Sequence, residues 1–290
     1  MSDIQIAGAT YLDVPSIVVP KADGGSAEYI EKGGPDDMMI QRLHGHLTSI
    51  SDDTLATMPS YGLAYATSLT SVSFPNLVTI SQYGFFNDYN IDFGDEWPFP
   101  LVKTIGNYAF RYCYGLKGDI VLPTTCTSIG QYSFANCDEI ETFRADGAIS
   151  TFGTYTFNGA SGHVMTMREC HLPHLGTSIA LNVNWGSSTA ANACQHLEIC
   201  DVGNAKSIAA NTFANCYKLQ TLILRRTSIT TLANVSAFLN TPMRGRDGLT
   251  GKIYVPESLI ESYKAAKVWV TLFGYGFVTF EAIEGSEWEL

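Results

Sequence analysis

Hydrophobic and polar residues alternate along this chain in a pattern that returns about every two dozen residues. Three stretches repeat it most clearly: TIGNYAFRYCYGLKGD at 104–119, SIGQYSFANCDEIETF at 128–143 and SIAANTFANCYKLQTL at 207–222. Each isoleucine is followed by an aromatic residue at plus five, a cysteine at plus eight and a Leu or Ile at plus eleven. The recurring positions are Ile105, Ile129 and Ile208; Phe110, Phe134 and Phe213; and Cys113, Cys137 and Cys216, with Cys194 in a partial copy.

The spacing of the copies predicts the architecture. Weaker copies begin at Ile80 and Phe152, so neighbouring starts at 80, 105, 129 and 152 lie 23 to 25 residues apart. A fixed period in the twenties is typical of a solenoid, in which each coil contacts only its neighbours. We therefore expect the Ile, Phe and Cys positions to form ladders inside one continuous core.

Each repeat has two halves with different periods. After the cysteine position, apolar residues alternate with polar ones, as in Leu69, Val72 and Phe74, which predicts a short strand with one buried face. Several of these segments end at a proline, such as Pro75 and Pro123, which offers no N–H to a sheet. The other half, IGxYxFxxC, has apolar residues at three-to-five spacing and predicts a short helical or 3-10 turn.

This unit resembles the BspA-like leucine-rich repeat, written LxxIxIPxxVxxIGxxAFxxCxxL. The resemblance covers roughly 47–256, with an irregular insertion near 161–193. It implies an α/β-type repeat solenoid, a right-handed coil with short strands on one face and short helical or 3-10 turns on the other. It also implies a non-enzymatic binding or adhesion protein that presents this surface to a protein or glycan partner on a host or bacterial surface.

Both ends of the chain differ from the repeat. Residues 1–46 lack it, and IAGATYLDVPSIVVPKADGG resembles the leading segment of prophage-encoded tail-associated proteins of gut bacteria, which predicts an attachment region. At the other end, GKIYVPESLIESYKAAKVW resembles the closing segment often found after BspA-like repeats, and residues 257–290 are expected to form a capping helix and tail. We expect Ser258 and Glu261 to form a capping box, and a cap is needed because the last coil would otherwise expose its apolar edge.

Composition and charge narrow the classes of partner. Hydrophobic residues make up 46% of the 290 residues, enough for a core, and charged residues only 16%. A net charge of −11 argues against nucleic acid, because neutralising phosphates needs clustered Lys and Arg. No apolar run reaches the roughly 18 residues of a membrane span, and no secretory signal is visible in this chain. An extracellular or cell-surface location and a virion-associated one both remain open.

The cysteines and histidines are interpreted as structural. A cysteine in every coil predicts packing, since a free thiol behaves as a small buried hydrophobe, although disulfides in a secreted protein stay possible. Cys170 precedes His171, yet no third residue that would orient a catalytic pair can be assigned. The pairs His44/His46 and His171/His174 are expected in solvated loops, and no cofactor is predicted.

One acidic stretch, NDYNIDFGDEW, invites a metal hypothesis. Asp88, Asn90 and Asp92 alternate as at the start of an EF-hand loop, but the glycine comes one place late and the bidentate position falls on Phe99. We expect an inserted acidic loop, with a calcium site only as a minor candidate. An enzymatic alternative is a glycan hydrolase that uses carboxylate pairs, either Asp88 with Asp92 or Asp52 with Asp53.

The predicted binding surface is the outward face of the strands. Alternation places every second side chain of a strand away from the core. The outward set includes the candidate binding residues Arg144, Asp201, Ile223, Arg225 and Tyr254.

Overall fold

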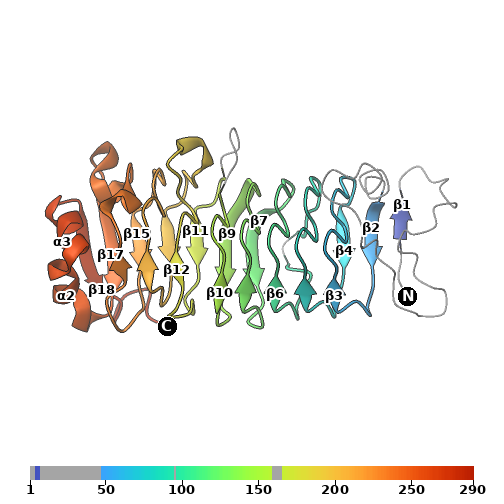
Figure 1. Cartoon of the computed structure of the whole chain (residues 1–290), viewed down its shortest axis with the longest axis horizontal. Coiled ribbons are helices and arrows are strands. Elements are labelled where there is room, and N and C mark those ends of the chain that lie inside the picture. Colours follow the sequence, from blue (N-terminus) through green and yellow to red (C-terminus); the bar gives the residue numbers. More distant parts are fainter. Residues whose placement is uncertain (1–3, 7–46, 95, 159–164) are drawn as a thin grey trace.

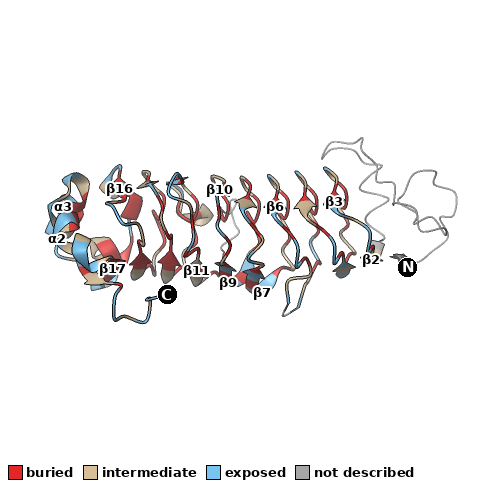
Figure 2. Ribbon diagram, turned by 90° about the horizontal axis from the view of Figure 1, so that it is seen from below, coloured by how far each residue is buried: buried red, intermediate tan, exposed pale blue. Residues whose placement is uncertain are grey.

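The computed structural model of the chain describes residues 4–6, 47–94, 96–158 and 165–290. Successive coils stack along one axis to form a solenoid (Figure 1). Between residues 117 and 232, each coil contributes a strand to a main parallel sheet, then a shorter strand to a second parallel layer, and closes with a turn. The buried residues line the space between these layers (Figure 2).

The main sheet is the longest continuous element. Its seven strands follow the order β18-β17-β15-β13-β11-β9-β7, and every neighbouring pair is parallel. The strands are β7 (Lys117–Leu122), β9 (Glu139–Ala145), β11 (Glu169–His171), β13 (Ile199–Asp201), β15 (Thr221–Ile223), β17 (Gly251–Val255) and β18 (Val278–Ala282).

The second layer is built from two-residue strands. One sheet has the order β10-β8-β6-β5-β3 and another the order β12-β14-β16. These strands are β3 (Thr57–Met58), β5 (Thr79–Ile80), β6 (Thr104–Ile105), β8 (Ser128–Ile129), β10 (Thr151–Phe152), β12 (Ala180–Leu181), β14 (Ser207–Ile208) and β16 (Thr231–Leu232). At the N-terminal end, β2 (Leu47–Ser51) pairs with β4 (Ser71–Ser73) and, antiparallel, with β1 (Ile4–Ile6).

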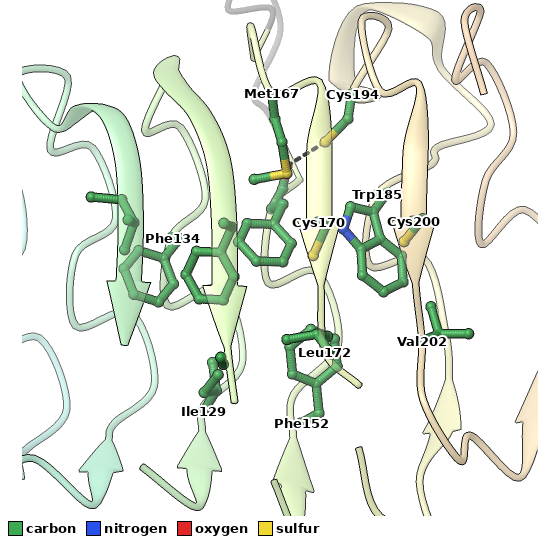
Figure 3. Packing of buried hydrophobic residues seen from close by; sticks show 14 of the residues in the cluster. Ile129, Phe134, Phe152, Met167, Cys170, Leu172, Trp185, Cys194, Cys200 and Val202 are labelled. Atoms are coloured by element: carbon green, nitrogen blue, oxygen red, sulfur yellow. Dashed lines mark hydrogen bonds between the residues drawn. The ribbon is translucent and has the colours of Figure 1, made fainter. Parts of the chain in front are cut away.

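The recurring apolar positions lie in register inside the solenoid. Ile80, Ile105 and Ile129 are paired across the second sheet. The aromatic positions stack from coil to coil at centroid separations of 5.1 to 6.1 Å, in the order Phe85, Phe110, Phe134, Phe157, Trp185, Phe213 and Phe238. All ten ladder residues named from the sequence are fully buried: Ile105, Ile129, Ile208, Phe110, Phe134, Phe213, Cys113, Cys137, Cys194 and Cys216. Figure 3 shows several of these side chains lined up along the axis.

Glycine after the isoleucine lets successive coils approach closely. A Cβ built on Gly130 would lie 2.5 Å from the backbone carbon of Gly106, and one on Gly153 would lie 2.2 Å from the backbone nitrogen of Gln131. Real Cβ contacts are longer, so a side chain here would push the coils apart. Glycine at these two positions therefore leaves room for the neighbouring backbone.

The segment expected to be an irregular insertion contains a coil with the same strands as its neighbours and a longer turn. Within 165–193, β11 joins the main sheet, β12 pairs with β14, and Trp185 continues the aromatic ladder. The pattern was hidden because Trp185 replaces phenylalanine and the 3-10 helix η1 (Ala190–Asn192) lengthens the turn before Cys194. Residues 159–164 lie outside the described part of the chain.

The last coil and its cap hold the remaining helices. The 3-10 helices of the last coil are η2 (Val235–Phe238), η3 (Pro242–Arg244) and η4 (Arg246–Gly248). The cap consists of η5 (Glu257–Leu259), α2 (Ile260–Ala265), α3 (Lys267–Gly274) and strand β18.

One feature of the cap differs from the sequence-based expectation. The capping box predicted at Ser258 and Glu261 is wrong, because a 3-10 turn precedes α2 and its N-cap is Leu259, with no side-chain cap. No helix in the described part of the chain is long and apolar enough to cross a bilayer.

Candidate functional site

The outward face of the main sheet presents its side chains in straight rows. One row runs across all seven strands, through Val121, Arg144, His171, Asp201, Ile223, Tyr254 and Glu281. A parallel row contains Asp119, Thr142, Glu169, Ile199, Thr221, Lys252 and Thr279. Parallel strands in exact register place one side chain of each coil beside its counterpart, so this face is a regular surface rather than a pocket.

A groove of about 1000 Å³ opens over the N-terminal half of this face. Five neighbouring coils contribute to it, through the acidic insertion before β7, the starts of β7 and β9, and the segments that lead into β11 and β13. Its lining residues are Gly94, Lys117, Gly118, Asp119, Glu139, Glu141, Thr166, Arg168 and His196. A break in register between Gly118 and Asp119 hollows the sheet here, with Gly118 at a φ of 67°.

The acidic insertion builds one wall of this groove. Phe93 and Trp97 anchor the loop by packing edge-to-face on Phe110, at centroid distances of 6.0 and 5.5 Å. Asp92 Oδ2 lies 2.7 Å from Lys117 Nζ, and Asp92 Oδ1 accepts from the Gly94 amide at 2.9 Å. These contacts hold Gly94 at the groove. The insertion therefore has a structural role that its sequence alone did not indicate.

Carboxylates outweigh free cations in the groove. Asp119, Glu139 and Glu141 are exposed there, facing the cations Lys117 and Arg168. Lys117 is paired, and its ammonium lowers the pKa of the Asp92 carboxyl, chiefly through their hydrogen bond. Asp92 in turn raises the pKa of Lys117. This exposed pair adds little stability but neutralises Lys117, so the groove surface is acidic.

Part of the C-terminal half of the same face is covered by the chain itself. The segment after β18 doubles back from the cap along the outer side of the sheet (Figures 1 and 2). The Trp288 ring stacks on His171 at a centroid distance of 6.3 Å and meets Tyr254 edge-on at 6.1 Å. Arg225 Nη1 donates to the Trp288 carbonyl at 2.7 Å. We call residues 284–290 the tail.

The tail changes the status of the residues predicted to bind. Asp201 is 2% exposed and Ile223 fully buried, so the expectation that both face solvent is wrong. Asp201 is used internally: its Oδ2 accepts from Arg225 Nε at 2.8 Å and its Oδ1 from the Gly203 amide. Tyr254 is half-buried, beside Trp288. Arg144 is exposed, with its Nε 2.7 Å from Asp146 Oδ2.

The calcium candidate is not assembled. Asp88 is fully buried in the cysteine ladder position, where its Oδ1 accepts from the Ala66 amide at 2.7 Å. Asn90 donates to the Thr67 carbonyl, and Asp92 pairs with Lys117. The three side chains therefore serve different partners. No cluster of three or more His, Cys, Asp or Glu residues suited to a metal occurs within the described ranges.

The carboxylate pairs suggested for a hydrolase do not form reaction centres either. Burial of Asp88 separates it from any substrate, and Asp52, 3% exposed, accepts from the amide and hydroxyl of Thr54. Both are structural acids.

The Cys170–His171 dipeptide is divided between two faces. Cys170 lies in the core, whereas His171 points outward, where its Nε2 lies 2.9 Å from Glu169 Oε2. All seven cysteines are buried and free. His174 is exposed, and His44 and His46 lie outside the described residues.

Four arginines cluster late in the sequence, but they do not come together as a site for a carboxylate or phosphate: Arg225, Arg226, Arg244 and Arg246. Arg225 serves Asp201 and the tail, and Arg226 donates to the Thr177 carbonyl and to Ser228. Arg244 and Arg246 lie over the rings of Tyr275 and Tyr217.

A comparison with family models decides what kind of protein this is. The model described as the BspA type leucine rich repeat region matches six copies, over residues 96–179 and 176–245. The chain belongs to the BspA-type leucine-rich repeat family. Members of this family are repeat proteins, generally without enzymatic activity.

Two solved structures are similar to the chain at low identity. A leucine rich cell surface protein from Faecalibacterium prausnitzii A2-165 is 15% identical, with a TM-score of 0.37, over 74% of this chain and 62% of its own. A leucine-rich repeat protein from Bacteroides ovatus ATCC 8483 is 16% identical, with a TM-score of 0.42, over 84% of this chain and 65% of its own. The chain thus spans less than two thirds of either protein's length. No curated protein matches the sequence.

Proposed function

We propose that this chain is a non-enzymatic binding protein that recognises a partner protein through the groove on its main sheet, in an extracellular or cell-surface setting. One observation carries the proposal: the groove opens on a regular outer face and is lined by residues from five neighbouring coils. Solenoid faces of this kind suit extended partners.

Charge indicates the chemistry of the partner. Asp119, Glu139 and Glu141 face the groove, Lys117 is neutralised by Asp92, and the whole chain carries a net charge of −11. Complementary charge steers association and suppresses wrong partners. The partner segment is therefore expected to carry Lys or Arg side chains.

The test uses defined probes and charge reversal. Labelled peptides of matched length, one lysine-rich and one glutamate-rich, are titrated into the chain at about 0.15 M salt. We expect the lysine-rich peptide to bind and the pair of changes Glu139→Lys and Glu141→Lys to weaken it by about tenfold or more. Glu261, whose side chain is 84% exposed in the cap, supplies the control Glu261→Lys. An equal loss in this control would mean that only net charge matters.

A glycan partner and a hydrolase are distinguished in the same series. A glycan array tests whether the groove binds sugar instead, with the same variants. The groove does hold three carboxylates, so release of reducing sugar is measured alongside binding. Hydrolysis by the wild type that Glu141→Gln abolishes would replace the binding proposal with the enzymatic one.

A further inference from the structure

The tail occupies a defined site on the sheet face. Trp288 is held between His171 and Tyr254, and its carbonyl accepts from Arg225. The site is separate from the groove and shares none of its lining residues.

The sheet residues at this site are buried, although their side chains lie on the outer face. Ile223 points away from the core yet is fully buried, and the side chains of Asp201 and Arg225 are only 2% and 11% exposed. Asp201 fixes the guanidinium, which directs Nη1 at the carbonyl above it. The site therefore offers the apolar side chain of Ile223, the rings of His171 and Tyr254, and the Arg225 donor. Together these groups can bind an aromatic side chain and its backbone carbonyl.

The tail is attached to this site by few contacts. Most of its hydrogen bonds stay within residues 283–290: for example, Ser286 Oγ accepts from the Trp288 amide, and the Gly285 amide donates to Glu289 Oε2. Glu284 Oε2 accepts from the Glu257 amide in the cap. Among the described residues, the contacts that hold residues 285–290 on the sheet are the hydrogen bond from Arg225 and the packing of the Trp288 indole.

The fit of the tail is incomplete. Trp288 Nε1 is buried and has no hydrogen-bond partner within the described residues. A buried donor without a partner disfavours the bound state, and a ligand that satisfies it would bind better. A ligand that supplies an acceptor for this donor would therefore compete with the tail for the site.

We propose that this site is a second recognition site, which binds a tryptophan-bearing peptide segment of a partner protein, and that the tail is a built-in competitor for it. The chain itself shows what the site accepts: an indole on His171 and Tyr254, with a main-chain carbonyl on Arg225. Because the competitor is tethered, its effective concentration is in the millimolar range, about 1 mM, and it lowers the apparent affinity for an external ligand.

The probe is a fluorescein-labelled peptide with the sequence of residues 283–290, IEGSEWEL. Its binding to the full chain is followed by anisotropy. We expect Trp288→Ala to release the site, so that this variant binds the peptide about tenfold more tightly than the wild type. A peptide with alanine in place of tryptophan should not bind. Leu290→Ala is the matched control, since Leu290 is 74% exposed in the same tail, and it should behave as the wild type.

Two results would overturn the inference: no peptide binding to Trp288→Ala, or equal affinity for this variant and the wild type. If the variant does not fold, hydrogen exchange of the wild type tests the same proposal. Unlabelled peptide at about 1 mM is expected to speed amide exchange in the tail by displacing it, and unchanged exchange would contradict the proposal. Binding at the groove is unaffected by either outcome.

Discussion

The recurring cysteines show how one side chain meets two needs inside the coil. Cys113 Sγ donates to the Phe85 carbonyl at 2.9 Å, and Cys137 Sγ donates to the Phe110 carbonyl at 3.0 Å. Each thiol thus fills space in its own coil and partners a backbone oxygen of the preceding one. Burial raises the pKa of both thiols, so they stay protonated as donors.

This arrangement predicts thiols that do not react in the folded chain. The thiolate is the nucleophile, and burial disfavours it; the pKa of Cys126, for example, is raised to about 11. A thiol reagent at neutral pH should therefore label none of the cysteines rapidly in the native state and all seven after unfolding without reductant. Fewer than seven after unfolding would reveal disulfides and contradict the ladder of free thiols.

Asp88 occupies the same ladder position as the cysteines, at the cost of a buried acid. Its Oδ2 has no partner among the described residues, and burial raises its pKa well above the ordinary value. The folded chain therefore binds this proton more tightly than the unfolded chain does. The contribution favours folding below the unfolded pKa and is lost as pH rises toward the folded pKa.

Asp88→Asn should remove that pH dependence. Asparagine keeps the acceptor for the Ala66 amide and carries no charge. We expect the variant to be more stable than the wild type in urea unfolding at pH 8, with a difference that shrinks or reverses near pH 3. A difference that does not vary with pH would show that the carboxyl is not protonated on folding.

The turn between the second sheet and the main sheet depends on left-handed residues. Tyr61, Tyr83, Tyr108, Tyr132 and Tyr155 have φ between 53° and 61° and stack from coil to coil at centroid distances of 4.6 to 5.1 Å. A bulky residue is strained there, whereas asparagine tolerates it, and Asn211 fills the equivalent place after Ile208. Stacking therefore offsets backbone strain in these turns.

Two substitutions at Tyr132 separate these effects. Tyr132→Ala removes two stacked contacts of about 0.5–1.5 kcal/mol each and keeps the strained φ, so we expect a loss of about 1–3 kcal/mol in urea unfolding. Tyr132→Asn also loses the stacking but relieves strain, and should be less destabilised. Equal losses in the two variants would mean that the backbone conformation costs nothing.

At the scale of the whole molecule, the cap covers the apolar edge of the last coil. Trp269 is 1% exposed and its Nε1 donates to the Thr230 carbonyl at 2.7 Å, while the Tyr263 hydroxyl accepts from the Thr230 amide. The cap thus satisfies the backbone of the last coil and covers its apolar edge. An exposed edge of stacked strands would invite aggregation.

Trp269→Ala should open this end. Loss of a buried indole typically costs about 3–5 kcal/mol, and the bared edge should cause self-association in size-exclusion chromatography. Val270, 44% exposed on the same helix, provides the control Val270→Ala, expected within about 0.5 kcal/mol of the wild type. Similar losses for the two variants would show that the cap does not stabilise the last coil through Trp269.

The sequence by itself determined the repeat, its period and the ladders inside it. Those features depend on spacing within one coil, and spacing dictates which side chains face inward. Phe110, Phe134 and Phe213 could be named as core residues for this reason, whereas Trp185 was missed because its coil departs from the consensus.

Only the tertiary structure decided which parts of the outer face are open. Arg225 and Trp288 meet across 63 residues, and the tail they join buries Ile223, which alternation alone had placed in solvent. In the same way, the ion pair between Asp92 and Lys117 holds the acidic insertion beside the groove, where it forms one wall. Contacts between distant segments depend on how the coils are stacked and closed, and no local pattern of polar and apolar residues encodes them.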